Sequence, residues 1–580
     1  MKTHKILTLS LLLLTTLVTQ AQTWQWAKSG GSSATGQDNS NREAIATIVT
    51  DSQGNVYTLS YLGGTDAVVN GVPRTTYNFG DDDRDALICS YTCTGALRWT
   101  RVLGGWNSDK ISNMGIDEND NIYIALKRVV GLSEIPDTNT HFEPSVILPM
   151  SSEFESTYKE TLFLVKYNSN GDLIWYRTPQ APNLSYIEGW YSISYDLSVD
   201  PQGNSYWYCA LYDGTYANGA YTVNSAINGS NHILKYDADG NFVTGIPISI
   251  RPFNGYSSYP GEGFKFKRNH NNGKFYFVGS LTNLGAIING QEYTPLDFDK
   301  YVCAFDSDGT FLWLKHNINT DARSIYDFSS TYSAHDIAFD SQNNIYYTGA
   351  GDSLITYIGN TSGILSVTAD GWNGQYFTDF DNTIFSFYKV LVKMDENGNN
   401  VWLTNSFGSD EYNAVELSIF VNNDEIITGS GAHNFKWQGI TNLNPLGNFC
   451  TCSRASITRF NKNTGAILGV DFATGFPGSS STFSRLAIDN NGSIYAGGSL
   501  TSAVTIASTT LYTNGGPDDF LLAKFGSNNC TFLGTTTNEQ DKTEFFPNPV
   551  NNELTVVSKE VLSYELFDSL GKKVQSGIVE

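Results

Sequence analysis

The chain has 580 residues, of which 40% are hydrophobic and only 16% are charged, whereas an ordinary domain is about 25% charged. The net charge is −23 at pH 7, and Lys and Arg form no cluster that could serve as a basic face for phosphates. This argues against a nucleic-acid partner. The 54 Gly, 33 Tyr, 33 Phe and 11 Trp residues suit strands and tight turns, and they predict an extracellular all-β protein.

The first residues have the pattern of an export signal. Lys2 and Lys5 precede an apolar run over residues 6–18, which Ala21 ends as a small residue. This predicts a signal peptide over residues 1–21 with cleavage between Ala21 and Gln22. The run is shorter than the roughly 20 residues that span a bilayer, and no later segment is apolar enough. We therefore expect an exported chain without a transmembrane segment.

One phrase recurs along the chain: an acidic residue, a polar turn, and then an aromatic strand. Clear copies occupy residues 51–57 (Asp-Ser-Gln-Gly-Asn-Val-Tyr), 117–123, 200–206, 340–346 and 489–495, and weaker copies occupy 269–276 and 421–426. A second phrase alternates with it: an apolar strand ending in an anchor residue, a turn with Gly, and a strand that begins near Trp. Its seven anchors are Tyr91, Tyr167, Tyr236, Phe305, Met394, Phe460 and Phe525, and five of them follow a basic residue (Lys166, Lys235, Lys393, Arg459 and Lys524).

Each phrase predicts two strands joined by a tight turn, because Asp, Asn and Gly supply the turn chemistry. Two hairpins make a four-stranded antiparallel sheet, which buries both apolar faces when copies stack around an axis. The fold class predicted is therefore all-β, a seven-bladed β-propeller over residues 22–534. Asp51 and Asp489 are six repeats and 438 residues apart, or 73 residues per repeat. Common propeller repeats have roughly 40–50 residues, so we expect long loops.

The two phrases together, Asp-x-x-Gly-Asn-x-Tyr and Gly-x-Leu-x-Trp around a strand with Lys and an aromatic, resemble the SBBP family of β-propeller repeats. The resemblance covers roughly residues 24–535, and the copies over 246–288 and 419–470 depart most from the pattern. It implies an architecture and no activity, because that family is defined by its fold.

Ring closure can also be predicted. Residues 24–31 (Trp-Gln-Trp-Ala-Lys-Ser-Gly-Gly) match residues 99–105 (Trp-Thr-Arg-Val-Leu-Gly-Gly), which form the last strand of a repeat. The final repeat, through Cys530, has no Trp strand of its own. We therefore predict that the strand at residues 24–28 completes the blade containing residues 519–525 and removes an open edge.

After Gly534 a polar linker (residues 535–543) leads to a small β-sandwich-like module at 544–580. Its Pro547-Asn548-Pro549 entry into a strand, and the hairpin turn with Asp568, Gly571 and Lys572, resemble the type A C-terminal sorting domain of type IX secretion substrates. The resemblance implies export by Sec and then by the type IX machinery to the outer-membrane surface or the medium. Members of that family continue into a further strand and a basic final strand, so we expect this copy to be partial. A small Ig-like module without a sorting role is the alternative.

No cofactor or metal site is predicted. The turns at residues 237–241 and 306–309 place oxygens at alternate positions, as Ca²⁺ prefers, but they lack the carboxylate at the twelfth loop position and are expected to be hairpin turns. Calcium stays an alternative for the acidic loop at 81–85. Cys450 and Cys452 would be half of a zinc site without a second half. Cys89 and Cys303 share one strand position in two repeats, which predicts buried small hydrophobes.

No catalytic constellation is predicted. His270, His316, His335 and His433 lie in turns or strand ends without a motif, and paired carboxylates need geometry to be recognised. Aromatic side chains are the better lead, although most of those between residues 186 and 221 fall on repeat strands and predict packing between blades. Two hypotheses follow: a non-enzymatic secreted or surface propeller that binds a protein or glycan through its loops, and alternatively a propeller-type polysaccharide hydrolase or lyase with carboxylates at the ring mouth.

Overall fold

The computed structural model divides into two compact units, Met1–Cys530 and Thr531–Glu580. In the larger unit the structure describes residues 22–33, 43–64, 66–77, 84–105, 109–130, 139–148, 159–179, 192–224, 230–252, 265–280, 285–294, 300–316, 335–353, 364–369, 372–377, 386–408, 418–422, 424–432, 435–437, 440–442, 452–526 and 530. In the smaller unit it describes residues 544–546, 555–557, 562–567 and 573–579.

Seven sheets among the described residues share one plan: four strands, here called A to D, each antiparallel to the next and in chain order except in blade 7, whose D strand is β1. We number these blades 1 to 7. Blade 1 consists of β2 (Ile45–Thr50), β3 (Val56–Gly63), β6 (Arg84–Tyr91) and β7 (Leu97–Gly104). Blade 2 consists of β8 (Lys110–Ile116), β9 (Ile122–Val130), β12 (Lys159–Tyr167) and β13 (Leu173–Arg177). Blade 3 consists of β14 (Ile193–Val199), β15 (Ser205–Leu211), β18 (Ser230–Tyr236) and β19 (Phe242–Ile248).

The remaining four blades repeat this order. Blade 4 consists of β21 (Lys265–Arg268), β22 (Phe275–Ser280), β25 (Lys300–Phe305) and β26 (Phe311–His316). Blade 5 consists of β27 (His335–Phe339), β28 (Ile345–Ser353), β31 (Ser386–Met394) and β32 (Asn400–Gly408). Blade 6 consists of β33 (Ser418–Val421), β34 (Glu425–Ala432), β37 (Arg454–Asn461) and β38 (Ile467–Phe472). Blade 7 consists of β40 (Ser481–Ile488), β41 (Ile494–Leu500), β44 (Asp519–Gly526) and β1 (Thr23–Gly31).

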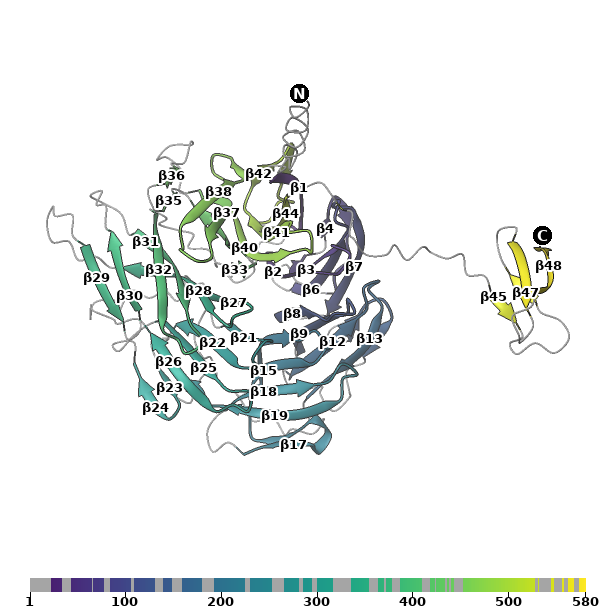
Figure 1. Ribbon diagram of the computed structural model, residues 1–580, viewed down its shortest axis with the longest axis horizontal. Helices are drawn as coiled ribbons and strands as arrows, with labels where there is room; N and C mark the ends of the chain where they lie inside the picture. Colours follow the sequence, from purple (N-terminus) through teal and green to yellow (C-terminus); the bar gives the residue numbers. More distant parts are fainter. Residues whose placement is uncertain are drawn as a thin grey trace, which may run out of the picture. The chain divides into compact units, whose positions relative to one another are not determined.

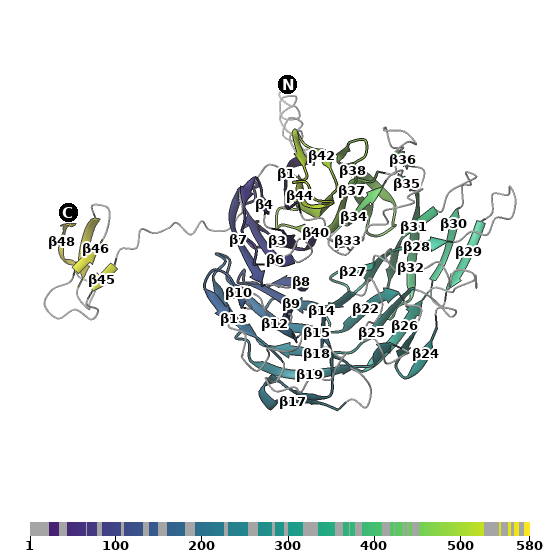
Figure 2. The same cartoon turned by 180° about the vertical axis from the view of Figure 1, so that it is seen from behind.

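The blades form a closed ring around one axis (Figures 1 and 2). Each A strand contacts the A strand of the next blade, from β2 and β8 round to β40, which contacts β2. The core lies between the blades, because each of the seven buried hydrophobic clusters draws its side chains from two neighbouring blades. This confirms the all-β propeller class, while the number of blades in the whole chain stays a prediction.

The antiparallel order gives the ring two different ends. The A–B and C–D turns lie at one end, here called the turn end. The B–C connections and the links to the next blade lie at the other, here called the loop end. The weak copies of the first phrase, at 269–276 and 421–426, are A–B turns of blades 4 and 6 like the clear ones.

The long connections of the loop end contain hairpins that lie against the preceding blade. The B–C hairpins of blades 1, 2 and 6 add a strand directly to the D strand of the blade before, and those of blades 4 and 7 pair with the segment that follows that D strand. The hairpins are β4 (Val68–Val69) with β5 (Val72–Pro73), β10 (Thr140–Phe142) with β11 (Val146–Leu148), β35 (Phe435–Trp437) with β36 (Ile440–Asn442), β23 (Ala286–Ile288) with β24 (Gln291–Tyr293) on β20 (Ile250–Pro252), and β42 (Ala503–Ile506) with β43 (Thr509–Tyr512) on β39 (Thr474–Gly475). The expected long loops therefore connect neighbouring blades by backbone strand pairing.

Blades 3 and 5 carry hairpins of their own. In blade 3, β16 (Gly214–Tyr216), the 3-10 turn η2 (Ala217–Gly219) and β17 (Tyr221–Val223) lie against blade 2, since the Ala217 N–H donates to the Pro179 carbonyl at 2.7 Å. In blade 5, β29 (Ile364–Ala369) pairs with β30 (Trp372–Phe377). No helix in the described part of the chain has the length and apolar character to cross a membrane.

The two ends of the larger unit meet in blade 7. Strand β1 pairs antiparallel with β44, with Trp24 opposite Phe525 and Ala27 opposite Ala523, which confirms the predicted ring closure. A disulfide between Cys93 and Cys530 adds a covalent bond across 437 residues of sequence, from the C–D turn of blade 1 to the end of blade 7. The first and last blades are therefore joined by backbone pairing and by a covalent link.

The smaller unit contains two hairpins among its described residues. Strand β45 (Glu544–Phe546) pairs with β46 (Thr555–Val557), and β47 (Leu562–Phe567) pairs with β48 (Lys573–Val579). Strands β46 and β47 agree with the two strands that the sequence predicts after Pro549, whereas β45 precedes the prolines and has no counterpart in that prediction.

Candidate functional site

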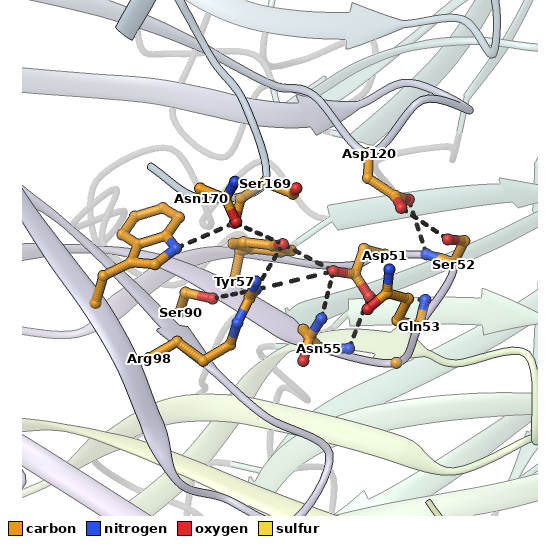
Figure 3. A network of polar contacts seen from close by, with 12 residues as sticks. Asp51, Ser52, Gln53, Asn55, Tyr57, Ser90, Arg98, Asp120, Ser169 and Asn170 are labelled. Atoms are coloured by element: carbon orange, nitrogen blue, oxygen red, sulfur yellow. Dashed lines mark hydrogen bonds and ion pairs between the residues drawn. The ribbon is translucent and has the colours of Figure 1, made fainter. Parts of the chain in front are cut away.

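The repeated acidic residue builds the A–B turn at the turn end. Asp51 Oδ1 accepts the backbone N–H groups of Gln53 (2.9 Å) and Asn55 (2.8 Å), and its Oδ2 accepts the Asn55 amide (2.7 Å) and the Tyr57 hydroxyl (2.8 Å) (Figure 3). Asp51 and Tyr57 are both buried, and burial next to this carboxylate raises the pKa of the Tyr57 phenol. Each residue of the phrase Asp-x-x-Gly-Asn-x-Tyr therefore has a structural role in the turn.

The same network recurs around the ring. The Tyr hydroxyl donates to the Asp four times more, at 2.9 Å in blade 2, 3.4 Å in blade 3, 3.0 Å in blade 5 and 3.3 Å in blade 7. Neighbouring turns are also linked, because Ser52 donates through its N–H (2.8 Å) and its hydroxyl (2.7 Å) to the Asp120 carboxylate in the next blade (Figure 3).

The second phrase joins several blades to the next. The indole N–H of the Trp donates to a backbone carbonyl in the following C–D turn: Trp99 to Ser169 (3.1 Å), Trp175 to Ala238 (3.2 Å), Trp313 to Glu396 (3.3 Å), and Trp26 to Cys93 (3.0 Å) across the ring closure. The basic residue before the anchor uses the same carbonyls, as when Lys166 Nζ donates to Ala238 at 2.9 Å.

The glycine of the C–D turn packs against the indole ring of the Trp in the preceding blade. A Cβ at Gly95 would come within 2.8 Å of the Trp26 ring, and one at Gly171 within 2.8 Å of the Trp99 ring. Both glycines also have a positive φ, +83° and +78°. The residues that define the repeat thus hold neighbouring blades together at the turn end. A binding or catalytic site particular to this protein is therefore expected at the loop end.

Paired carboxylates are buried at the loop end. Glu43, just before strand A of blade 1, and Asp519, at the start of strand C of blade 7, flank Gly31. Asp109 and Asp85 occupy the same two positions one blade further and flank Gly104. Burial raises the pKa of Glu43 to about 7 and that of Asp519 to about 7, and burial beside Asp109 raises the pKa of Asp85. The sequence could not pair these residues, since their partners are distant along the chain.

A partly exposed polar cluster lies beside the second pair, between the loops of blades 1 and 2. The Tyr77 ring stacks on the His141 ring with centroids 3.8 Å apart, and its hydroxyl donates to Glu143 at 3.0 Å. Arg74 forms an ion pair with Glu143, and the Val102 N–H donates to the same carboxylate at 2.9 Å. Burial and Glu143 raise the pKa of Tyr77 to about 12, so this phenol is a hydrogen-bond donor at neutral pH. No sequence motif surrounds His141, so the sequence alone gives no signal for it.

The predicted site residues are placed as follows. Gln22 is exposed just before β1, and Ala21 lies outside the described residues. The six residues of the predicted sorting motif, Pro547, Asn548, Pro549, Asp568, Gly571 and Lys572, also lie outside them. Of the acidic loop at 81–85, the structure describes Asp85, which is buried in the carboxylate pair.

The Asp-rich turns have the hydrogen bonds of hairpin turns. Asp237 Oδ1 accepts the N–H groups of Asp239 (3.0 Å) and Asn241 (2.8 Å). Asp308 accepts the Thr310 N–H at 2.9 Å. No group of three metal-ligating side chains occurs among the described residues. His270, His316 and His335 lie in a turn and at strand ends, as expected, and His433 lies outside the described part.

Cysteines and aromatic residues also follow the predicted packing. Cys89 and Cys303 are buried free thiols, as predicted, and so is Cys209. Cys452 is disulfide-bonded. Trp207, Tyr208 and Tyr216 are fully buried and pack in the clusters between blades, whereas Trp190 and Tyr191 lie outside the described residues.

Comparisons with known proteins identify the smaller unit. Residues 544–580 match the secretion system C-terminal sorting domain, which confirms the sorting module and indicates a secreted or cell-surface protein exported by the type IX machinery. No curated protein matches the chain. The SBBP repeat and the signal peptide stay predictions.

Solved structures resemble the chain distantly. A polysaccharide lyase, Uly1, has a TM-score of 0.40 at 10% identity and covers 85% of this chain and 92% of its own. A europium-containing methanol dehydrogenase has a TM-score of 0.32 at 10% identity, with 87% and 92% covered. The exotype rhamnogalacturonan lyase YesX has a TM-score of 0.28 at 10% identity, with 84% and 89% covered. At this level of similarity none of their activities transfers to the chain.

Proposed function

We infer that the protein is a secreted or cell-surface binding protein whose propeller holds a protein or glycan ligand at the loop end, without catalysing its turnover. The described blades bring their irregular connections to this end, and loops on a regular scaffold are where binding sites concentrate. The sorting domain supports the location in which such a ligand would be met.

One observation carries the proposal. Three neighbouring hairpins of the loop end each expose a large apolar side chain: Tyr512 on β43 (66% exposed), Val72 on β5 (57%) and Ile147 on β11 (60%). Their hairpins belong to blades 7, 1 and 2, which follow one another around the ring. Exposed aromatic and aliphatic side chains on neighbouring hairpins are suited to contact a sugar ring or a protein partner.

A glycan array and a search for protein ligands with the full chain test the proposal. Tyr512→Ser and Ile147→Ser should weaken binding at least about tenfold, which is the loss of a moderate contact residue. Ile174→Ser and Leu468→Ser are matched controls, because these side chains are both 48% exposed but lie at the turn end. Equal losses in both pairs, or none in the first, would refute a loop-end site.

The second candidate is a polysaccharide hydrolase or lyase. It is supported by the cluster of Tyr77, His141, Arg74 and Glu143, because His and carboxylates are the common acid–base groups. Tyr77, Arg74 and Glu143 are partly exposed, and His141 is buried beneath the Tyr77 ring. The same polysaccharides should therefore be screened for cleavage. Turnover that Glu143→Gln or His141→Gln abolishes would favour the enzyme, whereas binding without turnover favours the binding protein.

A further inference from the structure

The two buried carboxylate pairs at the loop end occupy equivalent places in successive junctions. In the junction between blades 1 and 2, Asp85 begins strand C, Gly104 ends strand D, and Asp109 precedes strand A of the next blade. Arg128, on strand B of blade 2, forms an ion pair with this carboxylate pair. Its Nη1 lies 3.2 Å from Asp109 Oδ1, and both side chains are buried. One positive charge therefore lies beside two buried carboxylates.

The junction between blades 7 and 1 has the same plan without the arginine. Asp519, Gly31 and Glu43 take the places of Asp85, Gly104 and Asp109. Leu62, fully buried on strand B of blade 1, stands where blade 2 has Arg128. A Cβ on Gly31 would lie 2.5 Å from Asp519 Oδ1 and 2.6 Å from Glu43 Oε2, so the two oxygens border the same small space.

The hydrogen bonds of this pair leave one oxygen unused. Glu43 accepts the Ser32 N–H (2.6 Å), the Ser32 hydroxyl (2.9 Å) and the Gly63 N–H (2.6 Å). Asp519 Oδ2 accepts the backbone and side-chain N–H groups of Asn514 at 3.0 and 2.8 Å. Asp519 Oδ1 is buried and has no hydrogen-bond partner among the described residues.

The other charged groups around the pair do not neutralise it. Asp66 and Asp518 are further carboxylates close enough to raise the pKa values of Glu43 and Asp519, respectively. Arg84 lies within electrostatic reach of Glu43, but its guanidinium is placed over the Tyr61 ring, 4.3 Å from the centroid. Two ionised carboxylates in this space would be strongly unfavourable, because a buried charge needs a compensating partner.

We propose that Glu43 and Asp519 share one proton across Gly31, and that this proton has the role that Arg128 has in the next junction and makes closure of the ring sensitive to pH. The proton lies between Asp519 Oδ1 and Glu43 Oε2, and it converts a repulsion into a hydrogen bond between blades 7 and 1. A proton suits the space better than a larger cation, since the buried residue at the strand position of Arg128 is the apolar Leu62.

The sign of the effect follows from the raised pKa values, which are about 7 in the closed ring against 4.5 for an exposed Glu. At pH values between 4.5 and 7, the closed state therefore binds more protons than the opened state. Stability from the shared proton is therefore complete at low pH, declines as the pH rises from about 4.5 to 7, and is constant above. Opening of the junction should become about 30-fold more favourable between pH 5.5 and 8.5.

Hydrogen exchange of the oxidised full chain, followed by mass spectrometry and corrected for the intrinsic rate, measures this opening. Protection of β1 and β44 should fall by that factor between pH 5.5 and 8.5, while β25 and β26 in blade 4 keep theirs.

Asp519→Asn should reduce the change to less than about threefold, because its amide can donate to Glu43 at every pH while its oxygen keeps the Asn514 bonds. Asp85→Asn is the matched control: both Asp85 oxygens accept backbone N–H groups, from Tyr77 (2.6 Å) and Gly105 (3.0 Å), so it should weaken the first junction and leave the pH response intact.

Infrared spectroscopy of the wild-type chain gives a second readout if Asp519→Asn does not fold. A protonated-carboxyl band present at pH 6 and lost by pH 8.5, and absent in Glu43→Gln, would support the shared proton. Equal protection of β1 and β44 at both pH values would overturn it. Protection that calcium restores and a chelator removes would also overturn it, since a metal ion would then occupy the space.

Discussion

The A–B turn network of blade 1 gives a quantitative prediction for Asp51→Asn. The substitution preserves the shape of the side chain but replaces one of two acceptor oxygens with an NH₂ group. Four donors meet the Asp51 carboxylate, at 2.7 to 2.9 Å, and an amide can serve only two of them. The two donors left over include either the buried Tyr57 hydroxyl or a buried backbone N–H. A hydrogen bond to a charged group contributes about 1.5–3 kcal/mol, so the loss should be at least about 3 kcal/mol.

Asp237→Asn is the matched control. Asp237 has the same turn geometry and accepts the Asp239 and Asn241 N–H groups and the Asn241 amide, but it is partly exposed, and among the described residues no tyrosine hydroxyl donates to it. Water can replace the bonds it loses, so the cost should stay below about 1 kcal/mol. Urea unfolding followed by tryptophan fluorescence, with equal m-values, measures both. Equal costs for the two variants, or a cost under about 1 kcal/mol for Asp51→Asn, would show that the buried network is not what stabilises the turn.

Three further predictions concern ring closure and pH. Deleting residues 22–31 removes the D strand of blade 7 with Trp26, and it should lower the thermal midpoint sharply; an unchanged midpoint would contradict the closure by β1. Cys93→Ser combined with Cys530→Ser should cost about 2–5 kcal/mol in urea unfolding, and adding a reductant to the wild type should cost at least as much, because it also reduces the disulfide of Cys452. Burial lowers the pKa of His232 to about 4, so the folded state binds fewer protons than the unfolded state below pH 6.5. Its contribution should fall by about 3 kcal/mol as the pH drops to 4, and the difference between His232→Gln and the wild type should show that slope.

The sequence was sufficient for features that depend on short segments. Asp51 to Tyr57 lie within one turn, so their spacing already contains the geometry that the structure shows. Closure by β1 was predictable for a similar reason, because residues 24–31 match a strand found in another repeat. The packing of Cys89 and Cys303 followed from their position on equivalent strands.

Other features depend on contacts that no local pattern contains. Cys93 and Cys530 are 437 residues apart, and nothing in their surroundings marks them as partners. The hairpins of the loop end are short and irregular, so their pairing with the preceding blade emerges only when the ring has formed. Glu43 and Asp519 become neighbours for the same reason, and the sequence gives no signal that pairs two carboxylates near its opposite ends.

The repeat itself offers a way to recognise what is particular to this protein. Every junction must satisfy the same packing, so a residue that keeps the repeat pattern is explained by the fold. A residue that departs from it at a buried position needs another explanation. Arg128 is such a departure, because Leu62, Leu211 and Leu500 hold the same position of strand B in blades 1, 3 and 7. It places a positive charge beside Asp85 and Asp109, whereas no arginine holds the equivalent position beside Glu43 and Asp519. The unbalanced charge lies at the junction where the chain closes on itself, and closure is the one step that the other junctions do not share. A titration centred there would therefore act on the ring as a whole and not on a single blade.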